Sequence, residues 1–165
     1  MRVQLAGTNV LSLAEVQVLG IPIIPSNTLL NDDFNSNTVV PNAAAWTGSI
    51  NTTQATTAAD DPVFTCGKFS AGQGTHSVWY SFTPNQAGKL AINTTGSSYD
   101  TVLAVWTGQR GKLTLSSCND DLNYPVNVQS GLQMNVTSGQ TYYVEVVGWG
   151  PYSAGTLKLT SSFMH

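Results

Sequence analysis

Short apolar segments divided by turn residues restrict the fold of this chain more than any other feature. The segments rich in β-branched and aromatic residues are 77–82, 89–93, 101–106, 113–115, 126–136, 142–146 and 156–159. Most alternate between apolar and polar positions, and Pro, Gly, Asn and Ser lie between them. Residues 101–106 are apolar on both faces, which is typical of a central strand. No segment is convincing as an amphipathic helix, so the pattern predicts an all-β sandwich or barrel.

Charged residues are scarce, and their scarcity excludes several classes of partner. Only 9% of the residues are charged, against about 25% in an ordinary soluble domain. The net charge is −3 and the six Lys and Arg are scattered, so we expect no nucleic-acid partner. No apolar run approaches the ~18 residues of a membrane span. The first residues also lack the apolar stretch of a signal peptide, so any secretion signal is expected upstream in a longer protein.

Two cysteines, Cys66 and Cys118, give information about the redox environment of the protein. Neither belongs to a CxxC motif, and no histidine lies close to either in the sequence. They form either a disulfide or two buried free thiols. We favour the disulfide because the charge-poor composition is typical of extracellular proteins, where disulfides persist.

The chain divides into two units and a linker. Residues 1–20 alternate as two short strands around a turn. Residues 21–30 contain Pro22 and Pro25, which prevent regular ladder pairing and predict a stiff extended linker. Residues 31–165 contain the remaining strand segments.

A series of motifs follows a fixed order in the second unit. The motifs are NDDF at 31–34, SVWYSFTP at 77–84, SYDTVLAVWTG at 98–108, CNDD at 118–121, VTSGQTYYV at 136–144 and GTL at 155–157. In this order, residues 31–163 resemble the bacterial pre-peptidase C-terminal domain family. The resemblance implies a jelly-roll-like antiparallel β-sandwich, appended to secreted proteases and other exported proteins, that has no chemistry of its own. Relatives on collagen-degrading enzymes bind matrix and hold calcium.

The first unit resembles a different family. Residues 2–9 (RVQLAGTN) and 11–18 (LSLAEVQV) are similar to the last two strands of a discoidin-type, coagulation-factor-like domain that binds carbohydrate or lipid. Only that tail is present, so the resemblance implies a context and no binding residues.

Acidic residues occur mainly in adjacent pairs. Six of the seven Asp form the pairs 32–33, 60–61 and 120–121. Calcium prefers about six to eight oxygen ligands, which carboxylates and amides supply. The candidate calcium ligands are Asn31, Asp32, Asp33, Asp100, Asn119, Asp120 and Asp121. The alternative is that these side chains cap turns and loops. Two Asp pairs brought together without a cation would repel, which favours either a metal or separation in space.

The sequence has no motif of an enzyme. Paired carboxylates occur in glycoside hydrolases, but adjacent Asp residues on loops need no catalytic purpose. His76 is the only internal histidine, and no GxSxG motif exists. Zinc would need more His or Cys ligands than the chain offers. We therefore expect a non-catalytic protein.

Two aromatic residues stand outside the strand pattern. Trp149 and Tyr152 belong to GWGPYS at 148–153, a segment without periodicity. Exposed loop aromatics stack on sugars or dock protein partners, whereas the alternative is a loop folded over the end of the sandwich. Trp79 and Trp106 lie in strand segments and are expected to pack in the core.

Two functions remain open. The first is an accessory module that attaches a secreted or cell-surface bacterial protein to polysaccharide, extracellular matrix or a cell-surface protein. The second is a structural subunit of an extracellular fibre or adhesin, which would self-associate by exchanging the strands of residues 1–20 with a neighbouring copy.

Overall fold

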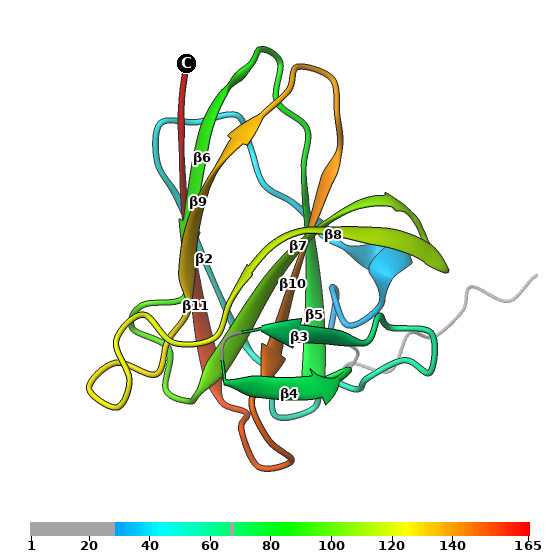
Figure 1. Ribbon diagram of the computed structural model, residues 1–165, viewed down its shortest axis with the longest axis vertical. Coiled ribbons are helices and arrows are strands. Elements are labelled where there is room, and N and C mark those ends of the chain that lie inside the picture. The colour runs from blue at the N-terminus through cyan, green and yellow to red at the C-terminus, as the bar shows by residue number, and fades with distance from the viewer. Residues whose placement is uncertain (1–28, 67) are drawn as a thin grey trace, which may run out of the picture.

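Two packed β-sheets form the molecule in the computed structural model, which describes residues 29–66 and 68–165 (Figure 1). The five-stranded sheet has the order β1-β5-β10-β7-β8, and the four-stranded sheet has the order β2-β11-β6-β9. The all-β sandwich predicted from the sequence is confirmed. The expected strand pair at 1–20 and the linker up to residue 28 lie outside the described residues.

The strands are short, and most match the apolar segments of the sequence. The five-stranded sheet contains β1 (Thr38–Val39), β5 (Thr75–Phe82), β7 (Thr101–Gln109), β8 (Lys112–Asn119) and β10 (Tyr142–Gly148). The four-stranded sheet contains β2 (Trp46–Asn51), β6 (Gly88–Asn93), β9 (Gly131–Val136) and β11 (Thr156–Met164). A 3-10 turn, η1 (Phe34–Ser36), precedes β1, and β3 (Phe64–Cys66) pairs with β4 (Phe69–Gly72) as a hairpin. Within the described ranges, no helix is long and apolar enough to cross a membrane.

One strand pair departs from the antiparallel arrangement. β1 lies parallel to β5, with Thr38 opposite Tyr80. The chain between these strands is long enough to form β2, β3 and β4, and parallel neighbours need such a long connection. The segment that begins at Asn31 therefore lies along β5, at one edge of the five-stranded sheet.

The central strands separate two cores by alternation of their side chains. Val78, Tyr80 and Phe82 of β5 point between the two sheets, whereas Trp79 points to the opposite face. β7 alternates in the same way and is buried from Thr101 to Trp106, which confirms it as a central strand. The five-stranded sheet is therefore covered on both faces.

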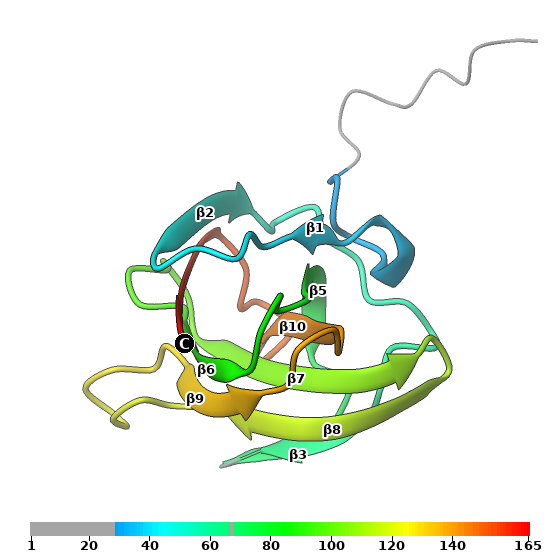
Figure 2. The same ribbon diagram turned by 90° about the horizontal axis from the view of Figure 1, so that it is seen from above.

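The β3–β4 hairpin and η1 supply the second cover. Phe34 of η1 and Phe64 and Phe69 of the hairpin pack around Trp79 and Trp106 on the outer face of the five-stranded sheet. Figure 2 shows β3 outside this sheet, beside β8. Both tryptophans are buried, as the sequence predicted.

A disulfide joins this hairpin to the sheet. Cys66 ends β3 and Cys118 lies near the end of β8, with sulfurs bonded at 2.26 Å and Cα atoms 5.9 Å apart. The predicted disulfide is confirmed. A two-stranded hairpin is marginal by itself, so the bond keeps the outer cover in contact with the sheet.

We expect loss of this bond to destabilise the protein substantially. Cys66→Ser with Cys118→Ser should lower the free energy of unfolding by about 3–4 kcal/mol, because the unfolded chain regains the freedom of a 52-residue loop. Chemical denaturation of the variant and of the oxidised and reduced wild type measures this loss. A reduced wild type as stable as the oxidised one would contradict the prediction.

A buried acid lies within the outer core. Glu145 of β10 is fully buried, and one of its carboxyl oxygens accepts a hydrogen bond from Nε1 of Trp106 at 2.9 Å. Burial, with a contribution from the charge of Asp61, raises the pKa of Glu145 well above its ordinary value. This side chain is therefore a neutral acid over much of the acidic pH range.

The Glu145→Gln variant tests this protonation state. The pKa of Glu145 is higher in the folded state than in the unfolded state. The neutral side chain therefore contributes fully to the free energy of unfolding below the unfolded pKa of about 4.3, and this contribution is lost as pH rises through the folded pKa. We expect the variant to become more stable relative to wild type as pH rises. The difference should grow by about 1.4 kcal/mol for each pH unit between the unfolded and the folded pKa of Glu145. Thermal unfolding between acidic and mildly alkaline pH measures the difference. Parallel pH profiles would contradict a raised pKa.

Candidate functional site

The residues predicted to bind calcium lie at the two ends of β7. Asp100 immediately precedes this strand. Asp33 lies at the other end, where it contacts Arg110, the residue that immediately follows the strand. A nine-residue strand spans roughly 30 Å, so the two groups are far apart. In Figure 1, η1 lies on one side and the loop after β8 (yellow) on the other.

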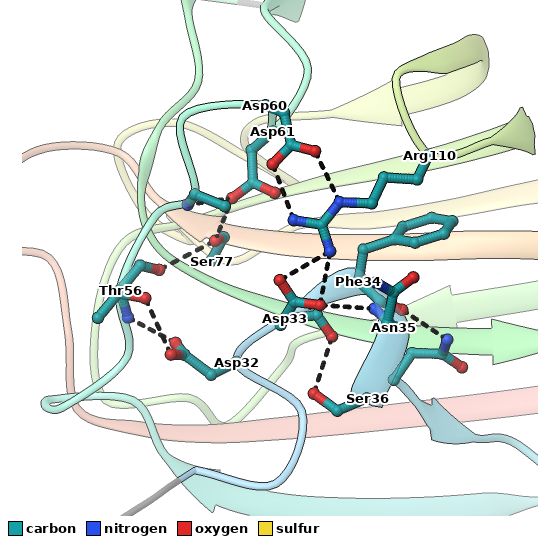
Figure 3. Close-up of polar contacts among 12 residues, drawn as sticks. Asp32, Asp33, Phe34, Asn35, Ser36, Thr56, Asp60, Asp61, Ser77 and Arg110 are labelled. Atoms are coloured by element: carbon teal, nitrogen blue, oxygen red, sulfur yellow. Dashed lines mark hydrogen bonds and ion pairs between the residues drawn. The ribbon is translucent and has the colours of Figure 1, made fainter.

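Arg110 binds two carboxylates that are distant in sequence (Figure 3). Its Nη1 donates to both oxygens of Asp33 at 2.7 and 2.8 Å, and its Nε and Nη2 donate to Asp60 at 2.6 and 2.8 Å. These hydrogen bonds lower the pKa of Asp33 and of Asp60. The chain itself therefore supplies the cation that these two carboxylates need.

Asn31 and Asp32 are also used within the fold. Nδ2 of Asn31 donates to the carbonyl oxygen of Trp79 at 3.2 Å, and the N–H of Trp79 donates to the carbonyl oxygen of Asn31 at 2.8 Å. Asp32 accepts hydrogen bonds from the N–H and the hydroxyl of Thr56. Asp33 additionally accepts from the N–H of Asn35 and so caps η1. Asp33 therefore caps a turn, whereas Asn31 and Asp32 bond to segments distant in sequence. The structure does not bring these three residues together with the other four candidate ligands.

The Arg110→Ala variant should lower the thermal unfolding midpoint by a few degrees at low salt. The pKa values of Asp33 and Asp60 are lowered in the folded state. The contribution of their ion pairs with Arg110 to stability is therefore present above the unfolded pKa of about 3.9 and is lost as pH falls through the folded pKa values. High salt should reduce the effect because the ion pairs are partly exposed. Lys112→Ala, at the same hairpin, is the matched control, and an equal loss in both variants would contradict the assignment.

The remaining acidic residues form a compact group, called here the acidic cluster: Asp100, Asp120 and Asp121. Asp100 precedes β7 while Asp120 and Asp121 follow β8, and these strands are antiparallel neighbours, so the three residues meet at one end of the sheet. One carboxylate oxygen from each lies within 4.8 Å of the other two. Each also has a buried Oδ1 without a hydrogen-bond partner in the described structure.

Buried hydroxyls hold the loop that carries this cluster. Oγ1 of Thr94 and of Thr101 are 2.6 Å apart, and the Ser130 hydroxyl lies 3.1 Å from Oγ1 of Thr101. The Ser130 hydroxyl also bonds to the carbonyl oxygen of Asp120 at 2.7 Å. Asp120 is thereby fixed, and only 2% of its surface is exposed.

Asn119 stabilises the same loop. Its Oδ1 accepts from the N–H of Gly131 at 2.8 Å, and its Nδ2 donates to the carbonyl oxygen of Asp121 at 3.2 Å. The side chain predicted as a metal ligand thus ties the two ends of the loop together.

The charges of the cluster perturb one another. Burial, then the charges of Asp121 and Asp120, raise the pKa of Asp100 to about 6. The pKa of Asp120 is raised as well, first by burial and then by Asp121. Burial and the neighbouring charge therefore disfavour the ionised forms of Asp100 and Asp120.

Aromatic side chains border the cluster. A pocket of about 220 Å³ is lined by Lys68, Asp100, Asp121, Tyr124 and Trp149. Trp149 and Tyr124 are 51% and 57% exposed. Nζ of Lys68 lies 3.3 Å from the centre of the Tyr124 ring, which is a cation–π contact. The pocket therefore combines open aromatic surface with carboxylate acceptors and one cation.

The loop after β10 places Trp149 beside the cluster. The N–H of Trp149 donates to the carbonyl oxygen of Asp100 at 3.2 Å, and the hydroxyl of Thr75 donates to the carbonyl oxygen of Gly150 at 2.7 Å. Tyr152 is 97% exposed in the same loop, outside the residues that line this pocket. Both aromatic residues remain candidates for ligand contact.

Sequence reasoning missed Tyr124 and Lys68. Residues 126–136 were predicted as one strand, but β9 begins only at Gly131. Backbone bonds from Leu122 to Gln129 and between Asn123 and Asn127 fold the preceding residues into a loop. The run of Asn and Pro around Tyr124 was the available signal for a loop with an exposed aromatic residue.

Further hollows adjoin the pocket. One of about 240 Å³ shares Lys68, Asp121 and Tyr124 with it. Another, of about 380 Å³, lies over β6 and β9 and meets the second at Leu122. Its lining residues are Ala91, Ile92, Asn93, Thr95, Leu122, Gly131, Leu132 and Gln133, none of which is charged.

No protein-family model matches the chain, and no match is found among curated proteins. Among solved structures, the chain is similar to the pre-peptidase C-terminal domain of collagenase from Bacillus anthracis. The similarity covers 76% of this chain and 94% of that domain, with 12% sequence identity and a TM-score of 0.46. That domain belongs to the family that residues 31–163 resemble, whereas these comparisons do not support the discoidin-type resemblance of residues 1–20.

Proposed function

We propose that the chain is a non-catalytic module that attaches a secreted or cell-surface bacterial protein to polysaccharide. The observation that carries this proposal is the pocket in which Trp149 and Tyr124, both about half exposed, border the acidic cluster. Sugar rings stack their C–H faces on open aromatic rings, and their hydroxyls donate to carboxylates. Lys68 adds a donor for sugar oxygens.

The shape of the surface favours a chain of sugars over a small ligand. The two hollows beside the acidic cluster hold about 240 and 220 Å³, less than the roughly 300–1,000 Å³ of deep pockets that bury most of a small ligand. Shared residues connect the three hollows from Trp149 through Tyr124 and Leu122 to β9. A polysaccharide lying along this path would contact several hollows at once.

The spacing of the acids favours binding over hydrolysis. The carboxyl groups of glycoside hydrolases lie about 5–9.5 Å apart on either side of the scissile bond. The oxygens of the acidic cluster lie within 4.8 Å of one another, and each residue has a buried oxygen. This arrangement leaves no room for a sugar between the acids.

Compartment and composition support an extracellular site of action. The disulfide between Cys66 and Cys118 suits an oxidising environment, and only 9% of the residues in the sequence are charged.

Substitution of the pocket aromatics tests the proposal. Binding of the purified chain to starch, cellulose, chitin and peptidoglycan is measured by pull-down and on a glycan array, with collagen as the protein-matrix comparison. We expect Trp149→Ala and Tyr124→Ala each to weaken polysaccharide binding by about tenfold or more, as expected for aromatic anchors. Tyr152→Ala should have a smaller effect because Tyr152 lies outside the pocket lining.

Val126→Ala is the matched control, since Val126 is exposed in the same loop as Tyr124 and lines none of the three hollows. It should bind as the wild type does. Binding to collagen alone, or polysaccharide binding that both aromatic variants retain, would contradict the proposal.

The alternative of a fibre or adhesin subunit depends on residues 1–20, which lie outside the described residues. Light scattering at several protein concentrations separates the two functions. A monomer agrees with an attachment module, whereas a polymer that grows with concentration agrees with the alternative.

A further inference from the structure

The two groups of acidic residues differ in how their charge is balanced. Asp33 and Asp60 share the guanidinium of Arg110, and the ion pairs of the described residues are all made by this arginine. The acidic cluster at the opposite end of β7 has no such partner within the described structure. Lys68 lines the same pocket, but its ammonium lies over the ring of Tyr124. The carboxylates of the cluster are therefore open to a positively charged ligand.

We propose that the acidic cluster binds the ammonium group of an amino sugar, which makes a polysaccharide with free amino groups the preferred ligand. Because it names the class of polysaccharide bound at the same site, this inference rests on the proposed function. A neutral sugar carries no charge to balance these carboxylates, whereas an ammonium group donates three charge-assisted hydrogen bonds.

Asp120 gives an independent sign of a missing hydrogen-bond donor. Only 2% of its surface is exposed, its Oδ2 accepts from the N–H of Lys68 at 3.1 Å, and its Oδ1 has no partner. A buried carboxylate oxygen without a donor is unfavourable, and charged donors form the strongest bonds to it. Asp120 also lines the hollow of about 240 Å³ that adjoins the pocket. A ligand in these hollows therefore lies next to an acid that lacks a donor.

The spacing of the carboxylate oxygens suits a primary ammonium group. Such a group has three N–H donors in a tetrahedral arrangement, and each forms a bond of about 2.8 Å to a carboxylate oxygen. Three acceptors around one nitrogen therefore lie about 4.6 Å apart. One oxygen from each residue of the acidic cluster lies within 4.8 Å of the other two. At this spacing one ammonium group reaches all three acids.

The aromatic surface beside the cluster favours an organic cation over a bare ion. Trp149 is half-exposed and lines the same pocket as Asp100 and Asp121. The N–H of Trp149 donates to the carbonyl oxygen of Asp100 at 3.2 Å, so the backbone keeps the two residues together. An amino sugar has an apolar C–H face and a charged group on one ring, and an aromatic ring attracts both. A bare ion leaves this aromatic surface without a ligand.

The hollow over β6 and β9 favours a polysaccharide over the lysine side chain of a partner protein. It holds about 380 Å³, none of its lining residues is charged, and Leu122 connects it to the hollow that Asp120 lines. A lysine side chain fills the acidic end alone. A polymer in which some sugars carry an ammonium group and others are neutral matches both the acidic cluster and the uncharged hollow.

Three oligosaccharides with the same backbone linkage test the inference. The oligomers of glucosamine, N-acetylglucosamine and glucose carry an ammonium, an acetamide and a hydroxyl group at the same carbon. Calorimetric titration of the whole chain near neutral pH, in chelator and at low salt, gives their affinities. We expect the glucosamine oligomer to bind about tenfold more tightly than the glucose oligomer, and salt should reduce this preference by screening the charges. A lysine peptide of equal length represents a protein ligand and should bind more weakly.

Charge variants locate the ammonium group. Asp100→Asn and Asp121→Asn should each reduce the preference for glucosamine over glucose to about twofold or less. Lys68→Gln should increase the preference, because the ammonium of Lys68 repels that of the ligand. A general folding defect does not produce opposite effects at neighbouring residues. Asp32→Asn makes the same substitution at the Arg110 end of β7 and should keep the wild-type preference.

The outcomes separate this inference from the proposed function. Equal affinity for the three oligomers, a preference that both cluster variants retain, or a preference that Asp32→Asn loses overturns the inference alone. So does tighter binding of the lysine peptide, or a preference for glucosamine that appears only when a divalent cation is added. A chain that binds none of the oligosaccharides overturns both the inference and the proposed function.

Discussion

Burial of the five-stranded sheet on both faces is the constraint on which the rest of the structure depends. Its central strands β5, β10 and β7 carry apolar side chains in both directions, and apolar surface stabilises the fold only where it is removed from water, at about 25 cal/mol per Å². The four-stranded sheet covers one face. The other is covered by pieces too small to fold alone, namely η1 and the β3–β4 hairpin. Two cross-links hold them in place: the disulfide to β8, and Arg110, which joins Asp33 next to η1 to Asp60 before the hairpin.

The carboxyl groups of the described residues lie in contrasting surroundings. Asp33 and Asp60 stay ionised because an arginine is hydrogen-bonded to both. Glu145 is fully buried beside Trp106, and burial favours its neutral form. The acidic cluster is intermediate, since each of its residues has a buried oxygen while Asp100 and Asp121 line a pocket. Partial burial without a hydrogen-bonded arginine distinguishes these three acids from Asp33 and Asp60.

Local chemistry made much of the fold predictable. Alternation along residues 77–82 and the apolar run at 101–106 indicate side chains on one or both faces of a sheet, and the structure confirms both. The prediction failed where side chains from distant segments determine the backbone conformation. Val126 continues an alternating pattern, yet the hydroxyls of Thr94, Thr101 and Ser130, together with Asn119, hold its segment in a loop. The parallel pairing of β1 with β5 likewise depends on where the chain returns after β4, which no local pattern records.

Local sequence patterns were enough to predict the all-β class, the central position of residues 101–106 and the burial of Trp79 and Trp106. Periodicity and residue chemistry are local properties, so each strand segment can be interpreted without knowing its neighbours in the fold. Which acidic residues lie close together depends on the three-dimensional fold. Asp33 and Asp121 belong to similar Asn-Asp-Asp motifs, but the length of β7 and β8 places them at opposite ends, one beside Arg110 and the other beside Asp100 and Trp149. Strand length and register set these separations, and a one-dimensional pattern of acids does not contain them.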